Sequence, residues 1–82
     1  MNIKKKEVLI TGGSGYIGSC LATYLSKNYS VTTLDKKNKN YFIKKKISHY
    51  KIDLCNKKKL FEIINKIKPQ IIIHLAGQST ID

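Results

Sequence analysis

The sequence reads Val8-Leu9-Ile10-Thr11-Gly12-Gly13-Ser14-Gly15-Tyr16-Ile17-Gly18 near its start, and this stretch decides the fold. The apolar residues predict the end of a buried strand, the glycines a tight turn, and the residues from Tyr16 the first turn of a helix. The early glycines allow backbone angles that a side chain would resist. Gly15 would let a pyrophosphate approach the backbone, and Gly18 would let the helix pack closely on the sheet. The N–H groups at the start of such a helix favour a phosphate.

The surrounding residues supply the context that a dinucleotide site needs. The run 13–18 satisfies G-x-G-x-x-G, a pattern that is informative between a strand and a helix with an acid about 20 residues further on. Here a strand is expected over 7–11, a periodic helical run extends from Tyr16 to Asn28, and the acid is Asp35. This combination favours dinucleotide binding over a glycine turn of purely structural origin.

The run 11–18 resembles the T-G-x-x-G-x-x-G fingerprint of the extended short-chain dehydrogenase/reductase family, the NAD-dependent sugar-nucleotide epimerases and dehydratases. The resemblance implies NAD as cofactor, a nucleotide sugar as substrate of the full-length enzyme, and leaves a homodimer open. It covers most of this chain but only the N-terminal portion of such an enzyme. We therefore expect residues 1–82 to form a partial NAD-binding domain of Rossmann type.

Length and composition limit the other possibilities. Eighty-two residues make at most one small domain, and 41% hydrophobic residues with clear periodicity favour a folded chain. Cys20 and Cys55 match no metal-site spacing, and reduced thiols in the cytoplasm are expected. No apolar run approaches the ~18 residues that a membrane-spanning helix needs, so no membrane partner is expected.

The formal net charge of +11 points to a different class of function. A lysine excess of this size is found in proteins that bind nucleic acids or other polyanions. The sequence contains no arginine, however, which is the residue suited to bidentate phosphate and base contacts. Lysine, isoleucine and asparagine all have AT-rich codons, which explains the excess by genome composition. Nucleic-acid binding is therefore the weaker alternative.

The remaining elements are predicted by periodicity. In the first helix, one apolar face is expected from Ile17, Leu21, Tyr24 and Leu25, with a stop at Asn28. The second strand is expected over 31–35 and the third over 49–53, joined by a lysine-rich crossover in which 41–46 form one short helical turn. A second helix is expected over 57–68, with the apolar stripe Leu60, Ile63, Ile64 and Ile67.

Local signals define the ends of the second helix and the strand that follows. Asn56 is suited to cap the helix, and Pro69 ends it. The run 71–75 is expected to be a fully buried fourth strand. The fold class is therefore α/β, the N-terminal half of a doubly wound parallel sheet with four strands in the order 3-2-1-4, incomplete as given.

Asp35 is the clearest candidate for cofactor selection. At the end of the second strand, its carboxylate would accept hydrogen bonds from the adenosine ribose hydroxyls and repel the extra phosphate of NADP. The position favours this role over that of an ordinary surface acid, although Lys36 and Lys37 would offset part of the repulsion.

The resemblance assigns further residues at the ends of the third and fourth strands. Asp53-Leu54 matches an Asp-hydrophobic pair that contacts adenine in this family, with a helix cap as the alternative for Asp53. His74-Leu75-Ala76-Gly77 resembles the family's His-x-Ala-(Ala/Gly) segment beside the cofactor, and His74 is expected to be a hydrogen-bonded structural residue. The expected cofactor-binding residues are Gly12, Gly15, Tyr16, Ile17, Gly18, Asp35, Asp53, Leu54, Leu75, Ala76 and Gly77.

Catalytic residues are not expected within these 82 residues. The family uses a Ser or Thr with a Tyr-x-x-x-Lys pair on a later helix, which is expected beyond Asp82. Tyr41 and Lys45 have the right spacing but lie between the second and third strands, so we interpret this match as accidental. A non-catalytic nucleotide-binding module of the same fold is the second hypothesis.

Overall fold

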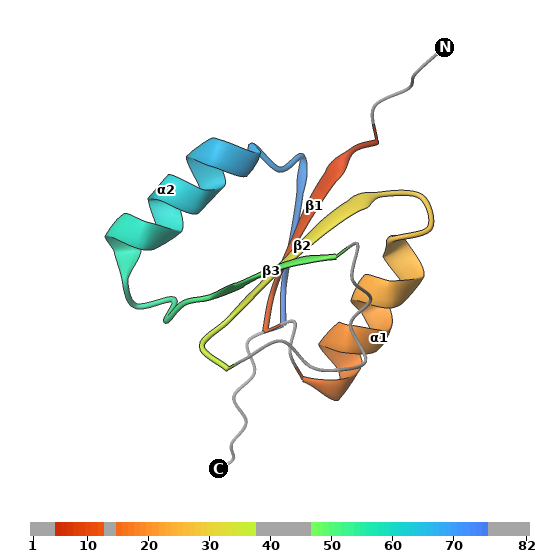
Figure 1. Ribbon diagram of the computed structural model, residues 1–82, viewed down its shortest axis with the longest axis horizontal. Coiled ribbons are helices and arrows are strands. Elements are labelled where there is room, and N and C mark those ends of the chain that lie inside the picture. Colours follow the sequence, from red (N-terminus) through yellow and green to blue (C-terminus); the bar gives the residue numbers. More distant parts are fainter. Residues whose placement is uncertain (1–4, 13–14, 38–46, 76–82) are drawn as a thin grey trace.

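The computed structural model describes residues 5–12, 15–37 and 47–75. Along the chain the elements are β1 (Glu7–Thr11), α1 (Tyr16–Leu25), β2 (Ser30–Asp35), β3 (Ser48–Lys51), α2 (Lys57–Ile67) and β4 (Ile71–His74) (Figure 1). The short helical turn predicted over 41–46 lies outside the described residues, as do the predicted site residues Ala76 and Gly77.

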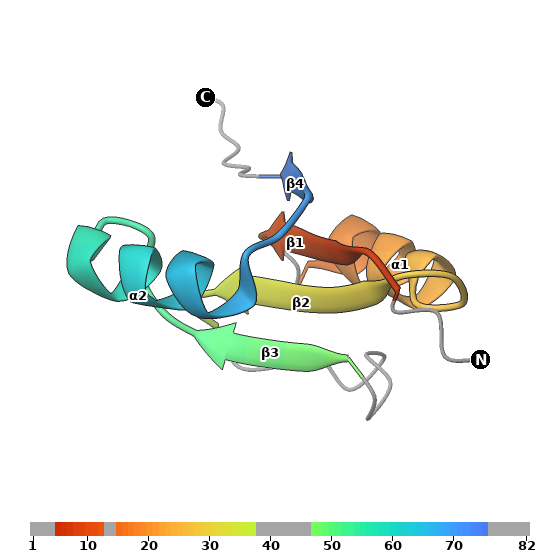
Figure 2. The ribbon, with the colours of Figure 1, turned by 90° about the horizontal axis from the view of Figure 1, so that it is seen from above.

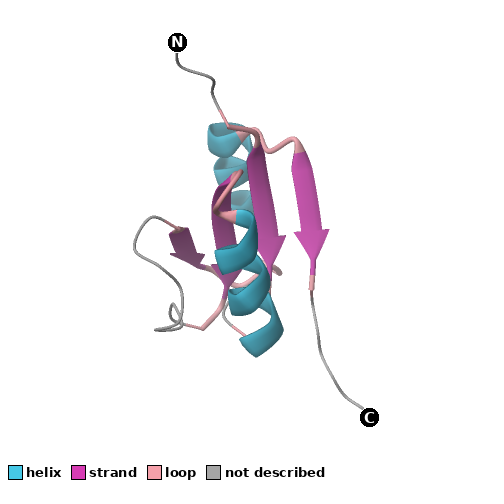
Figure 3. Cartoon of the chain, turned by 90° about the vertical axis from the view of Figure 1, so that its right-hand side faces the viewer, coloured by secondary structure: helices cyan, strands magenta, loops and turns pink. Residues whose placement is uncertain are grey.

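The four strands form one sheet in the order β3-β2-β1-β4, and every neighbouring pair is parallel. This confirms the predicted strand order, and Figure 3 shows the arrowheads pointing toward one edge. In register, Thr11 lies opposite Leu34 on one side and opposite His74 on the other. The carboxyl ends of β1, β2 and β4 therefore meet at the same level.

The sheet is covered by one helix on each face (Figures 1 and 2). Successive side chains of a strand point to opposite faces, so the apolar run of β1 serves two cores. The core on the α1 side contains Val8, Ile10, Ala22, Val31 and Ile47. The core on the α2 side contains Leu9, Leu34, Ile52 and Ile63.

Helix α2 forms largely as its local sequence predicts. Its stripe faces the sheet: Ile63 is buried, and Leu60, Ile64 and Ile67 are partly buried against the same core. The side chain of Asn56 accepts a hydrogen bond from the backbone N–H of Lys59, which confirms the predicted cap. The helix ends one residue earlier than expected, because Lys68 adopts a left-handed conformation (φ 52°) before Pro69.

Helix α1 has half of the predicted apolar face, because Leu21 and Leu25 are partly buried against the core on the α1 side and the other two residues are not. Ile17 and Tyr24 are 72% and 68% exposed, while the buried residues are the small Gly18, Ser19 and Ala22. Small side chains let the helix backbone lie close to the sheet, which leaves the longer side chains at the margins of the contact. The helix also ends at Leu25 rather than at Asn28, whose N–H closes the following turn on the Leu25 carbonyl.

Two of the strand predictions also need correction. β4 is not fully buried: Ile71 and Ile72 are 37% and 55% exposed, because within the described part of the chain β4 pairs with β1 alone. β3 covers Ser48–Lys51 rather than 49–53. Neither α1 nor α2, the helices of the described ranges, has the length and apolar character to cross a membrane.

Candidate functional site

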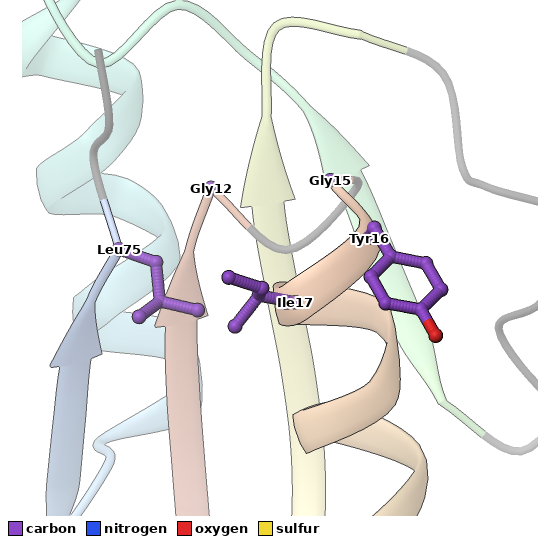
Figure 4. Close-up of a pocket in the computed structure, with 6 residues that line it drawn as sticks. Gly12, Gly15, Tyr16, Ile17 and Leu75 are labelled. Atoms are coloured by element: carbon purple, nitrogen blue, oxygen red, sulfur yellow. The ribbon is translucent and has the colours of Figure 1, made fainter. Parts of the chain in front are cut away.

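A cavity of about 360 Å³ opens at the carboxyl edge of the sheet, between the ends of β1 and β4 and the start of α1. Figure 4 shows the side chains of Leu75 and Ile17 pointing toward each other across it, below Gly12. The lining residues are Gly12, Gly15, Tyr16, Ile17, Gly18 and Leu75. All six belong to the expected cofactor-binding residues, and the structure brings them together from two segments far apart in the sequence.

The cavity lies where the strand order reverses. From β1 the chain proceeds to β2 and β3 on one side, and then returns to place β4 on the other side of β1. The N–H of Gly12 donates to the Leu34 carbonyl (2.8 Å), and the N–H of Leu75 donates to the Thr11 carbonyl (2.9 Å). In open α/β sheets this reversal point is where ligands bind, because the loops on its two sides diverge and leave a crevice.

Gly12 is required by the chain itself. Its φ is +78°, a conformation that residues with side chains rarely adopt. A Cβ added at this position would lie 2.7 Å from the Leu75 carbonyl oxygen, and that oxygen belongs to backbone. The glycine therefore permits the close approach of the β1 and β4 ends that forms the floor of the cavity.

Gly15 differs from Gly12 in both respects. Its φ is −73°, which residues with side chains also adopt, so the backbone angle does not require a glycine here. Among the described residues apart from its neighbours in the chain, the one atom within 4 Å of an added Cβ is the Gly12 carbonyl oxygen at 3.8 Å, an ordinary contact. Since the described chain has room for a side chain here, the glycine keeps space clear on the cavity side. This is what the close approach of a pyrophosphate requires.

The start of α1 is suited to an anion. Gly15 is the N-cap residue, and within the described ranges no side chain caps this end; its first turn also contains no acid. Helix α2 provides the contrast, since Asn56 accepts the N–H of Lys59 there. The N–H groups and positive dipole end of α1 therefore face the cavity without an anionic partner from the first turn.

Asp35 lies at the same edge, next to the cavity but not in its lining. It ends β2 and is half-buried, and its carboxylate accepts a hydrogen bond from the backbone N–H of Lys37 (3.1 Å). Its backbone carbonyl accepts from the N–H of Ile52 (2.8 Å). The Gly12–Leu34 hydrogen bond places this carboxylate one strand away from the glycine turn.

Asp53 lies one strand further, in the exposed turn after β3. Its carboxylate accepts the backbone N–H of Cys55 (2.9 Å), and this hydrogen bond lowers the pKa of the Asp53 carboxyl, with smaller contributions from the Cys55 thiol and the charge of Lys36. The alternative role of helix cap is wrong, because Asn56 occupies the cap position of α2. Leu54 is half-buried against the core on the α2 side.

Two histidines contact threonines on neighbouring strands. His74 is exposed and its Nδ1 is hydrogen-bonded to the Thr11 hydroxyl, in agreement with the expected structural role. The sequence analysis did not single out His49, whose ring bonds the Thr33 hydroxyl and the Lys37 carbonyl. The register that pairs Thr33 with His49 could have indicated the first contact, whereas the second depends on the path of the chain after β2.

A parallel sheet that reverses its strand order beside a glycine turn and a helix start defines a dinucleotide-binding fold of Rossmann type. The chain belongs to the NAD dependent epimerase/dehydratase family, whose model matches residues 8–82. This family membership agrees with the resemblance noted from the glycine-rich turn.

Individual relatives carry two kinds of name. The UDP-glucose 4-epimerase of Mycoplasma genitalium is 38% identical over 84 residues, covering 94% of this chain and 25% of that protein. The dTDP-D-glucose 4,6-dehydratase of Dictyostelium discoideum is 36% identical over 88 residues, covering 94% of this chain and 20% of that protein. The crystal structure of the UDP-glucose 4-epimerase of Thermus thermophilus in complex with NAD matches with a TM-score of 0.81 at 28% identity, covering 90% of this chain and 25% of that chain. The chain thus spans at most about a quarter of the length of these relatives.

Proposed function

We propose that this chain is the NAD-binding portion of an NAD-dependent sugar-nucleotide epimerase or dehydratase. The observation that carries the proposal is the start of α1, where Gly15 leaves space at a helix end without a side-chain cap from the described residues. The cavity lies at the reversal point of the sheet, where this fold binds dinucleotides. Family membership and a relative solved with NAD support the same cofactor.

The chain's residues then have distinct roles toward the bound dinucleotide. Gly12, Gly15 and the first N–H groups of α1 would hold the pyrophosphate. Asp35 would accept the adenosine ribose hydroxyls, and Asp53-Leu54 would lie against the adenine. Leu75 would lie beside the cofactor, followed by Ala76 and Gly77, which are outside the described residues. When bound, NAD would supply the acceptor for a hydride from the sugar.

The substrate and setting extend the same proposal. The names of the relatives support a nucleotide sugar such as UDP-glucose or dTDP-glucose as the substrate of the full-length enzyme. We place the protein in the cytoplasm, where thiols stay reduced, since Cys20 and Cys55 are exposed free thiols. A homodimer of the full-length enzyme is carried over from the family resemblance alone.

Calorimetric titration of the chain with NAD and with NADP tests the proposal. We expect NAD to bind more tightly, and Asp35→Asn to lower NAD affinity by about tenfold or more, since a hydrogen bond to a charged group contributes ~1.5–3 kcal/mol. Asp35→Asn should also narrow the difference between the two nucleotides. Glu62→Gln removes the same charge from the exposed face of α2 and serves as the matched control. Tighter binding of NADP, or no binding of either nucleotide, would contradict the proposal.

A further inference from the structure

We propose that His49 is a positioning residue that fixes the Asp35–Lys37 turn and thereby sets the preference for NAD over NADP. This inference rests on the proposed role of Asp35 in binding the adenosine ribose. His49 itself lies on β3, one strand away from Asp35, and is not expected to contact the nucleotide. Its effect would pass through the backbone of Lys37.

The ring of His49 bridges two strands and the turn between them. Nδ1 lies 2.6 Å from the hydroxyl of Thr33, its register partner on β2. Nε2 lies 3.0 Å from the backbone carbonyl oxygen of Lys37. The ring thus spans from the middle of β2 to the residue two positions beyond its end (Figure 1 shows β2 beside β3).

The chemistry of the partners assigns the proton on the ring. A carbonyl oxygen only accepts hydrogen bonds, so Nε2 must carry the hydrogen that bonds Lys37. In the neutral ring Nδ1 is then the acceptor, and the Thr33 hydroxyl donates to it. Thr33 is fully buried, which fixes the position of its hydroxyl and hence the orientation of the ring. The hydroxyl has one hydrogen, so its longer bond to the Ser48 carbonyl (3.4 Å) competes with the His49 contact and is the weaker of the two.

The anchored turn is the one that holds the Asp35 carboxylate. The N–H of Lys37 donates to that carboxylate (3.1 Å), while the carbonyl of the same residue accepts from His49. The backbone carbonyl of Asp35 accepts from the N–H of Ile52. If the His49 bond is lost, the Lys37 carbonyl loses this anchor, and the backbone of Lys37, whose N–H orients the carboxylate, is held less firmly. The ribose would then meet a less fixed acceptor.

His74 provides a matched comparison within the same sheet. Its Nδ1 bonds the hydroxyl of Thr11, its register partner, as that of His49 bonds Thr33. The two histidines lie on opposite outer strands of the sheet, and His74 is on β4, across β1 from the Asp35 turn. A variant of His74 therefore removes a histidine–threonine contact without touching Lys37, whereas a variant of His49 removes both contacts.

The test measures the ratio of the NAD and NADP dissociation constants in variants of the chain. His49→Phe keeps a ring but removes the donor, and His49→Asn keeps a short polar group that ends too early to reach Lys37. Both should lower the preference for NAD by about threefold to tenfold, the effect of one hydrogen bond. His49→Gln, which extends a donor to the place of Nε2, should restore most of the preference. His74→Phe should leave the ratio unchanged.

A second measurement does not depend on nucleotide binding. Amide hydrogen exchange at Lys37, followed by NMR in the free protein, should be faster in His49→Phe and His49→Asn than in His49→Gln or His74→Phe. Unchanged exchange would overturn the inference even if the chain binds no NAD, an outcome that by itself contradicts the proposed function.

Three outcomes of the binding measurements would also overturn the proposed role of His49. The ratio could stay within about twofold of the unmodified chain in both His49→Phe and His49→Asn, a change smaller than the loss of one hydrogen bond. The ratio could fall equally in His49→Gln, which would show that the loss of the hydrogen-bond donor to Lys37 is not the cause. It could also fall by the same factor when Asp35 is already Asn, which would show that the effect does not pass through Asp35.

Discussion

Two of the glycines that line the cavity, Gly12 and Gly15, allow the same substitution to be compared at two positions. Gly12→Ala and Gly15→Ala each add one methyl group, three residues apart in one turn. At Gly12 the methyl would have to enter a left-handed conformation and would meet the Leu75 carbonyl oxygen at 2.7 Å. At Gly15 the φ of −73° suits alanine, and the nearest described atom outside its chain neighbours is 3.8 Å from the methyl. The structure therefore predicts opposite effects on folding and on binding.

The magnitudes follow from these contacts. For Gly12→Ala, the left-handed backbone costs about 1–2 kcal/mol, and the displacement of the Leu75 backbone adds about 1–3 kcal/mol. The expected loss is a large part of the roughly 4–12 kcal/mol of unfolding free energy typical of a chain of 82 residues. For Gly15→Ala, alanine lowers the conformational entropy of the unfolded chain, which stabilises the fold, but it is a poorer N-cap residue than glycine, which destabilises the fold. The free energy of unfolding should therefore change by less than about 1 kcal/mol. NAD affinity should fall by about tenfold or more, because the methyl holds the pyrophosphate away from the helix N–H groups.

Urea unfolding followed by far-UV circular dichroism measures the first effect, and calorimetric titration with NAD measures the second. The dependence of the unfolding free energy on urea should be unchanged if the variants differ only in stability. The reasoning is refuted if the free energy of unfolding of Gly12→Ala lies within about 0.5 kcal/mol of that of the unmodified chain, since a change this small is typical of surface substitutions. It is equally refuted if Gly15→Ala loses as much stability as Gly12→Ala, since Gly15 would then serve the fold alone.

Two further predictions concern the turn after β3 and the edge of the sheet. The pKa of the Asp53 carboxyl is lowered by the Cys55 N–H, so this bond should stabilise the fold fully above pH ~4 and be lost as the pH falls through the lowered pKa. The free energy of unfolding, measured with urea between neutral and acid pH, should depend less on pH in Asp53→Asn than in the unmodified chain. The same pH dependence in both proteins would contradict this. β4 is an outer strand of the described sheet, and such a strand can pair with another chain. Ile72 is 55% exposed on it, so Ile72→Lys should lower the self-association of the 82-residue chain, measured by sedimentation velocity. Unchanged association would show that this edge is not where chains meet.

Local sequence was sufficient where a segment's own residues carry the interactions that form it. Helix α2 has its cap in Asn56, its stop before Pro69 and its apolar stripe within one continuous run. The cap and the stripe were predicted as found, and the stop was predicted to within one residue. For α1 the same reasoning was right for Leu21 and Leu25, which pack against the core, and wrong for Ile17 and Tyr24, which are exposed. That helix instead presents Gly18, Ser19 and Ala22 to the sheet. The distance between helix and sheet decides which face is buried, and periodicity does not report that distance.

The sequence by itself determined the parallel α/β class, the place of the glycine turn between β1 and α1, and the strand that ends in Asp35. These follow from residues close together in the chain: apolar runs, glycines, and an acid at a fixed spacing. Only the tertiary structure showed that Gly12 and Gly15 are glycines for different reasons. Gly12 is required by the carbonyl of Leu75, the residue after β4 and more than sixty positions along the chain. Gly15 lies in an ordinary conformation, and the described residues outside its chain neighbours make no close contact there. The contact of His49 with the turn that holds Asp35 was likewise decided by tertiary structure, through the pairing of β2 with β3 and the path of the chain after β2. Contacts between distant segments depend on strand register and on the path of loops, and neither is encoded in the spacing of residues within one segment.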